Sequence, residues 1–118
     1  MERISRILVV DDDESIRRGL SRVLTEAGYD VQVAADAESA WSKVVASGGP
    51  DLVITDLTLP GKSGMDLIAA VRDRGIEVTI VVLTGTGSIA SAVEATRRGV
   101  YDYLVKPVDA PRTAVVPR

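Results

Sequence analysis

The feature that most constrains the fold of this chain is a set of four short apolar segments, at residues 6–10, 51–55, 78–83 and 101–105. Runs such as ILVV and TIVVL are rich in β-branched residues and barely alternate, which is typical of parallel strands buried on both faces. A further segment, 30–34, alternates more (DVQVA) and is expected at an edge of the sheet. The sequence therefore predicts a five-stranded parallel sheet.

The segments between these strands carry the periodicity of helices, with apolar residues three and four positions apart. Capping residues mark the expected helix starts, and glycines follow the expected helix ends. The caps are Asp13, Asp36, Ser63 and Ser88, and the glycines are Gly28, Gly48, Gly75 and Gly99. Strict alternation of strand and helix implies right-handed crossovers that cover both faces of the sheet. We therefore predict the α/β class, with a single doubly wound sheet.

The composition limits the kinds of function. The chain has 118 residues, 46% of them hydrophobic and 26% charged, which fits one globular domain. It has no Cys and no His, which excludes disulfides, thiolate metal sites and Ser-His catalysis. The net charge of −3 argues against nucleic-acid binding, and no apolar run approaches the ~20 residues of a membrane helix. We therefore expect a cytoplasmic protein with neither a nucleic-acid nor a membrane partner.

Polar side chains follow all the predicted strands except the edge one. The first strand runs into Asp11, Asp12 and Asp13, and the others end at Asp56, Thr84 and Lys106. Each has an ordinary explanation: the first three can cap a helix, Asp56 can start a turn, Thr84 can be an ordinary strand-end hydroxyl, and Lys106 can be an exposed cation. In open α/β sheets, however, functional groups collect beyond the carboxyl ends of the strands. Their occurrence at four strand ends favours a site at that edge.

The chemistry of these residues suits a hard cation. Two carboxylates about 4 Å apart repel by roughly 1–4 kcal/mol at effective dielectric constants of 80 to 20. Lys106 offsets part of this repulsion, and a divalent cation offsets more. With oxygen ligands alone, Mg²⁺ is the first expectation and Mn²⁺ the second. The same groups suit phosphoryl transfer, with Asp56 as a covalent nucleophile.

These residues lie in segments that together resemble the receiver domain of bacterial two-component response regulators. The segments are ILVVDDDES, DLVITDLTLPGKSG, VVLTG and YDYLVKP, in the family's order and spacing over residues 4–109. The resemblance implies the flavodoxin-like strand order 2-1-3-4-5. It also implies a switch rather than an enzyme, with at most slow autophosphorylation and autodephosphorylation.

The resemblance assigns roles at the phosphoryl site. Asp56 would be the phosphoacceptor, and Thr84 and Lys106 would contact the phosphoryl group. Tyr103 would change rotamer when Thr84 is drawn toward the phosphate. The peptide bond between Lys106 and Pro107 would be cis, which is common only before proline.

The resemblance also implies the ligands of a Mg²⁺ ion. Asp12 and Asp56 would bind it directly, together with the backbone carbonyl of Thr58. Asp11 would act largely through water.

The C-terminus departs from the family pattern. A fifth helix would be expected after Pro107, but Pro111 and Pro117 leave room for little more than one turn. We therefore expect a receiver domain over residues 1–109, a missing or stunted fifth helix, and a weakly structured tail or truncated helix at 110–118. Such a tail would expose apolar flanks of the first and fifth strands and of the first helix, which would favour a homodimer.

The function predicted from the sequence is a phosphorylation-dependent switch in a two-component system. A partner sensor histidine kinase would supply the phosphoryl group, and the surface of the fourth helix and fifth strand would change. The chain would be the receiver part of a transcriptional regulator. The alternatives are an interaction or dimerisation module with little phosphorylation-dependent output, and an aspartyl-phosphate phosphatase, although Thr58 replaces the second Asp that such enzymes use. A dinucleotide-binding reading of residues 85–90 (GTGSIA) is disfavoured because the motif follows the fourth strand, not the first.

Overall fold

A computed structural model of the chain describes residues 4–59, 61, 63–85, 93, 94, 96, 97 and 99–105. Its strands are β1 (Arg6–Val10), β2 (Asp30–Ala34), β3 (Leu52–Asp56), β4 (Thr79–Thr84) and β5 (Asp102–Val105). Its helices are α1 (Glu14–Glu26), α2 (Ala37–Val45) and α3 (Gly64–Asp73). Residues 93–94 and 96–97 are also helical, within the region where the sequence predicts a fourth helix.

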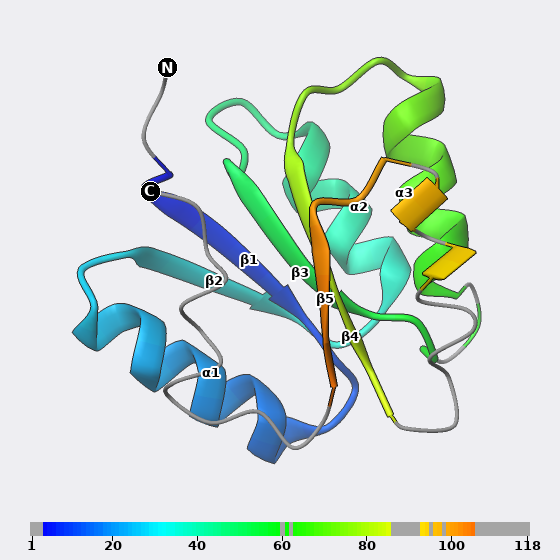
Figure 1. Ribbon diagram of the computed structural model, residues 1–118. Coiled ribbons are helices and arrows are strands. Elements are labelled where there is room, and N and C mark those ends of the chain that lie inside the picture. Colours follow the sequence, from blue (N-terminus) through cyan, green and yellow to red (C-terminus); the bar gives the residue numbers. More distant parts are fainter. Residues whose placement is uncertain are drawn as a thin grey trace.

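The five strands form one sheet in the order β2-β1-β3-β4-β5, and every neighbouring pair is parallel. Helix α1 covers one face of the sheet, and α2 and α3 cover the other (Figure 1). This is the flavodoxin-like, doubly wound arrangement, so the predicted fold class and strand order are confirmed. β2 is an edge strand, as its alternating sequence predicts.

The strand boundaries match the predictions closely. β1 and β2 have the expected bounds, and the other three begin one residue later than expected. Asp51 lies just before β3, and its carboxylate accepts hydrogen bonds from the N–H groups of Ser5 and Arg6. At the other end, Asp56 is part of β3 because it pairs with Leu83 of β4.

Two apolar cores lie on the two faces of the sheet. The core under α2 and α3 includes Leu8, Ile68 and Ile80, and the core under α1 includes Leu24 and Leu83. Burial of each such side chain contributes roughly 1.5–3 kcal/mol. These two cores hold the strands rigidly, so the residues at the strand ends have fixed positions.

The helices begin at the predicted caps. Asp13, Asp36 and Ser63 are the N-caps of α1, α2 and α3, and Ser63 forms a capping box with Asp66. The expected cap Ser88 lies outside the described residues. The longest described helix, α1, has 13 residues. Within the described part of the chain, no helix has the length and apolar character needed to cross a membrane.

The apolar residues of β1, β5 and α1 include deeply buried ones: Ile7 is 1% exposed, Leu104 3% and Leu20 5%. The expected exposure of the flanks of these elements depends on the tail, so this expectation and the homodimer stay predictions. The predicted tail and the fifth helix lie outside the described residues.

Candidate functional site

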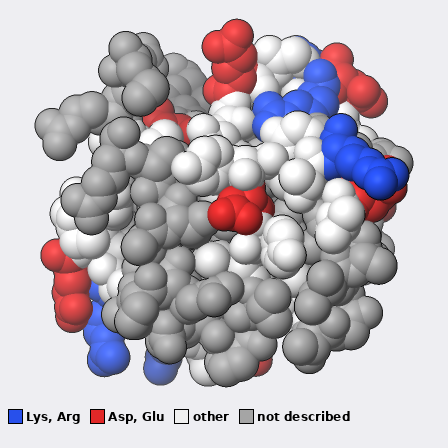
Figure 2. Space-filling view, viewed as in Figure 1, with Lys and Arg blue, Asp and Glu red and all other residues white. Residues whose placement is uncertain are grey.

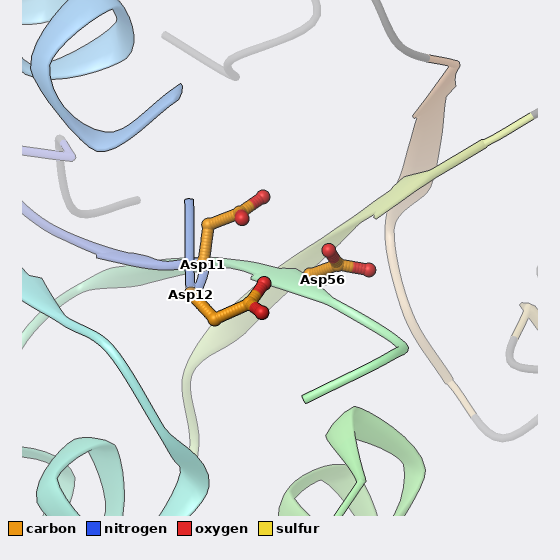
Figure 3. Close-up of side chains that lie close together, drawn as sticks. All are labelled: Asp11, Asp12 and Asp56. Carbon is orange, nitrogen blue, oxygen red and sulfur yellow. The ribbon is translucent and has the colours of Figure 1, made fainter. Parts of the chain in front are cut away.

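Three carboxylates meet where β1 and β3 end. Asp11 and Asp12 follow β1, and Asp56 is the last residue of β3. β1 and β3 are parallel neighbours with Val10 opposite Thr55, so their carboxyl ends lie side by side. One oxygen from each carboxylate lies within 4.8 Å of the other two. The side chains point into a common region (Figure 3). The prediction that Asp11, Asp12 and Asp56 converge is therefore confirmed.

Asp11 is fixed by hydrogen bonds on three sides. It is fully buried, its N–H donates to the carbonyl of Ala34 (3.1 Å), and its Oδ1 accepts the N–H of Asp13 (2.9 Å). Its own carbonyl accepts a hydrogen bond from Nη1 of Arg17 (2.7 Å). The helix-capping explanation applies only to Asp13, whose carboxylate accepts the N–H of Ser15 (2.8 Å). Asp11 and Asp12 are thus directed to the site rather than to the helix.

Asp56 is 7% exposed, and its Oδ1 accepts the N–H of Thr58 (2.9 Å). This hydrogen bond closes the turn that the ordinary explanation of Asp56 predicts. The carboxylate of Asp56 is at the same time one of the three in the cluster. The turn explanation of Asp56 is therefore confirmed, and its predicted role as the phosphoacceptor stays a prediction. The proposed use of the Thr58 carbonyl as a metal ligand stays a prediction.

Gly64 brings the start of α3 against the end of β3. A Cβ atom at this position would overlap the main-chain oxygen of Asp56 and would lie 2.9 Å from Cα of Leu57. The N–H of Gly64 donates to the carbonyl of Leu57 (3.0 Å). Only glycine permits this approach, so Gly64 helps to set the position of the Asp56 main chain. The sequence analysis did not identify Gly64, although glycine at a first helical position, where it is unfavourable, was a clue.

Thr84 and Tyr103 lie on the same face of adjacent strands. Val82 pairs with Tyr103 and Thr84 pairs with Val105, which puts Thr84 one diagonal step from Tyr103. Val82 and Tyr103 both contact the core under α2 and α3, and side chains alternate along β4, so Thr84 belongs to that face too. Thr84 is buried, and its hydroxyl donates to the carbonyl of Gly85 (3.1 Å). This arrangement fits the predicted coupling of the two residues.

Lys106 and Pro107, the other two predicted site residues, lie outside the described residues. The predicted contact of Lys106 with a phosphoryl group and the predicted cis peptide bond therefore stay predictions.

The donor set fits the Mg²⁺ that the sequence predicts. All three side chains offer carboxylate oxygens, which are the ligands that hard cations prefer. Two oxygens bound to one Mg²⁺ lie at most about 4.2 Å apart, which is twice the ordinary Mg–O distance. The three oxygens lie within 4.8 Å of one another, and which of them would bind the ion directly stays a prediction.

The charged residues that are seen on one face of the molecule are mixed (Figure 2). On the face shown in Figure 2, the basic residues lie next to acidic ones and form no continuous basic patch within the described part of the chain. Nucleic-acid recognition generally uses a clustered basic surface. This face therefore offers no such surface among the residues that can be seen.

Comparison with known proteins identifies the relatives of this chain. The family described as "Response regulator receiver domain" matches residues 7–115. The DNA-binding transcriptional regulator NtrC of Rhizobium meliloti is 37% identical over 103 residues, which cover 87% of this chain and 21% of that protein. The photosynthetic apparatus regulatory protein RegA of Rhodobacter capsulatus is 39% identical over 104 residues, covering 88% of this chain and 56% of that one.

A solved structure shows the same fold. The receiver domain of NtrX from Brucella abortus superposes with a TM-score of 0.86 and 37% identity, covering 93% of this chain and 92% of that one. The chain thus spans about a fifth of the length of NtrC and just over half of RegA, but nearly the whole of this isolated receiver domain.

Proposed function

This chain belongs to the response regulator receiver domain family, and from that premise we propose that it is a switch controlled by phosphorylation of Asp56. The observation that carries the proposal is the convergence of three carboxylates at the ends of β1 and β3. Receiver domains bind Mg²⁺ through such an acidic pocket. In this chain Asp12 and Asp56 would hold the ion directly, and Asp11 would hold it through water.

In the proposed reaction a carboxylate oxygen of Asp56 attacks the phosphorus atom of a phosphohistidine on a sensor kinase. The bond between phosphorus and the imidazole nitrogen breaks, the imidazole takes up a proton from water, and an acyl phosphate forms on Asp56. These 118 residues contain no His, so the phosphohistidine would lie outside them, on the proposed sensor kinase. When bound, Mg²⁺ would neutralise charge on the phosphoryl oxygens.

The residues around Asp56 support this reaction. The Thr58 N–H holds Oδ1 of Asp56 at 2.9 Å and so restricts rotation of the carboxylate. Restricting the nucleophile to one orientation lowers the entropic cost of an in-line attack. Lys106 would contribute a positive charge to the same phosphoryl group.

The proposed output passes from Thr84 to Tyr103. New charge on Asp56 would draw the Thr84 hydroxyl away from the Gly85 carbonyl, which it now contacts at 3.1 Å. Tyr103 lies one diagonal step away on the same face, so its side chain would move into the space that Thr84 leaves. The surface that includes β5 would then change its affinity for a partner.

The relatives suggest the setting of this switch. NtrC is by name a DNA-binding transcriptional regulator, and this chain matches about a fifth of it. We propose that the chain is the receiver part of a transcriptional regulator in the cytoplasm, and that any DNA binding belongs to a different part of that protein.

The test is phosphorylation by a small donor. Incubation with acetyl phosphate and Mg²⁺, followed by intact mass measurement, should show one added phosphoryl group on the wild-type chain. Asp56→Asn should show none, and Asp51→Asn, which changes a carboxylate at the opposite edge of the sheet, should still be phosphorylated. A folded wild-type chain that gains no phosphoryl group would contradict the proposal and favour a pure interaction module. Rapid multiple-turnover hydrolysis of acetyl phosphate would instead favour a phosphatase.

A further inference from the structure

Arg17 connects the first turn of α1 to the acidic site. Its guanidinium Nη1 donates to the carbonyl of Asp11 at 2.7 Å, and its main-chain N–H donates to the carbonyl of Asp13 at 3.1 Å. One residue therefore holds both ends of the short turn from Asp11 to Asp13. The first bond has a charged donor, which makes it stronger than an ordinary amide hydrogen bond.

The carbonyl that Arg17 contacts belongs to the peptide group between Asp11 and Asp12. This peptide group is planar, so its orientation sets the directions in which both residues leave the main chain. The carboxylate of Asp11 is further held by the Asp13 N–H at 2.9 Å. Loss of the Arg17 contact would allow this peptide to rotate, and both carboxylates would then lose their common direction.

We propose that Arg17 is a positioning residue for the cation site, acting through the Asp11–Asp12 peptide. This inference rests on the proposed function, because the ion it serves is the Mg²⁺ of the receiver site. Groups that orient metal ligands typically change metal affinity by about 10–100-fold when they are removed.

A positioning role and a simple charge effect predict opposite results. If Arg17 acted only as a positive charge near the site, its removal would tighten Mg²⁺ binding, since repulsion of the cation would fall. If Arg17 positions the ligands, its removal weakens binding. The sign of the change therefore distinguishes the two.

Arg18 provides a matched control. It is the next residue of the same helix, its side chain is 80% exposed, and it pairs with Glu14 at 3.8 Å. Arg18→Met removes the same charge as Arg17→Met but leaves the contact with the Asp11 carbonyl in place.

The first measurement is the Mg²⁺ dissociation constant of the full chain, obtained by calorimetric titration with MgCl₂. We expect Arg17→Met to bind Mg²⁺ at least tenfold more weakly than the wild type, and Arg18→Met to bind equally or slightly more tightly. An Arg17→Met variant that binds as tightly as Arg18→Met overturns the inference. A wild-type chain that binds no Mg²⁺ contradicts the proposed function itself.

The second measurement needs no metal. Amide hydrogen exchange in EDTA should be several-fold faster at Asp13 in Arg17→Met than in the wild type, because the acceptor of that N–H, Oδ1 of Asp11, is no longer held. Arg18→Met should exchange at the wild-type rate. Equal exchange in all three proteins overturns the claim that Arg17 holds this turn, whatever the Mg²⁺ affinity.

Discussion

Carboxylates at the two ends of the strands have opposite surroundings. The first edge is the side of the sheet where the parallel strands begin, and the second edge is the side where they end. Where the strands begin, Asp51 accepts hydrogen bonds from the Ser5 N–H (3.0 Å), the Ser5 hydroxyl (3.1 Å) and the Arg6 N–H (2.9 Å). Where the strands end, the carboxylates of Asp11, Asp12 and Asp56 face one another within 4.8 Å. The first edge surrounds one negative charge with donors, whereas the second gathers three negative charges. A carboxylate at the first edge joins elements of the fold, while those at the second form a cluster that could hold a cation.

The pKa values agree with this contrast at the first edge. The pKa of Asp51 is lowered, mainly by the hydrogen bond from the Arg6 N–H and next by that from the Ser5 N–H. Its charged form therefore stabilises the native state. At the second edge, three carboxylates close together would repel one another, and a bound cation would offset that repulsion.

The largest effect on stability that we predict comes from the second edge. Gly64→Ala should lower the free energy of unfolding by about 2–3 kcal/mol, since the new Cβ would overlap the main-chain oxygen of Asp56, which cannot rotate away. Urea unfolding measures the change, and phosphorylation by acetyl phosphate should slow in the same variant.

Gly19→Ala is the control for that substitution. Gly19 lies within α1, and a Cβ atom there would meet nothing within 4 Å. This variant should gain up to about 1 kcal/mol from helix propensity. If the two substitutions changed the free energy of unfolding equally, the close approach of α3 to β3 would not restrict the residue at position 64.

A smaller effect is expected at the first edge. Asp51→Ala should lower the free energy of unfolding by about 1–2 kcal/mol, because three hydrogen bonds to a charged acceptor are lost from a partly solvated position. The control is Asp73→Asn, which changes an exposed carboxylate at the end of α3. This variant should change the free energy of unfolding by less than about 0.5 kcal/mol. An Asp51→Ala variant as stable as Asp73→Asn would remove the contrast between the two edges.

The first edge should also be sensitive to acid. A group whose pKa is lower in the folded than in the unfolded state stabilises the fold above its unfolded pKa and ceases to do so as the pH falls through the folded one. The stability difference between wild type and Asp51→Asn should therefore be constant from about pH 7 to 5 and shrink below about pH 4. Urea unfolding curves of both proteins at each pH measure this stability difference. A difference that grows on acidification would contradict the lowered pKa of Asp51.

The sequence is sufficient to predict whatever depends on local pattern. The buried strands, their alternation with helices and the caps at Asp13, Asp36 and Ser63 follow from periodicity and side-chain chemistry. The convergence of Asp11, Asp12 and Asp56 follows as well, because the carboxyl ends of parallel strands share one edge.

Contacts that individual side chains make with main-chain groups outside a regular pattern were not predicted. Arg17 has the sequence environment of an ordinary helix surface residue, and only the structure shows that it contacts a carbonyl six residues earlier. Asp51 was assigned to a strand, yet its carboxylate instead binds main-chain groups some 45 residues away in the sequence.

The central claim is that the carboxylates at the ends of β1 and β3 are arranged for a divalent cation at a cost to the empty fold. The most direct test is urea unfolding of the wild type and of Asp12→Asn, each with and without Mg²⁺. Without Mg²⁺ the variant should be the more stable protein, because one of three repelling charges is gone. At ten times its dissociation constant, Mg²⁺ should stabilise the wild type by about 1.4 kcal/mol and the variant by clearly less. A wild type that is indifferent to millimolar Mg²⁺, or a variant that is less stable without it, would contradict the account.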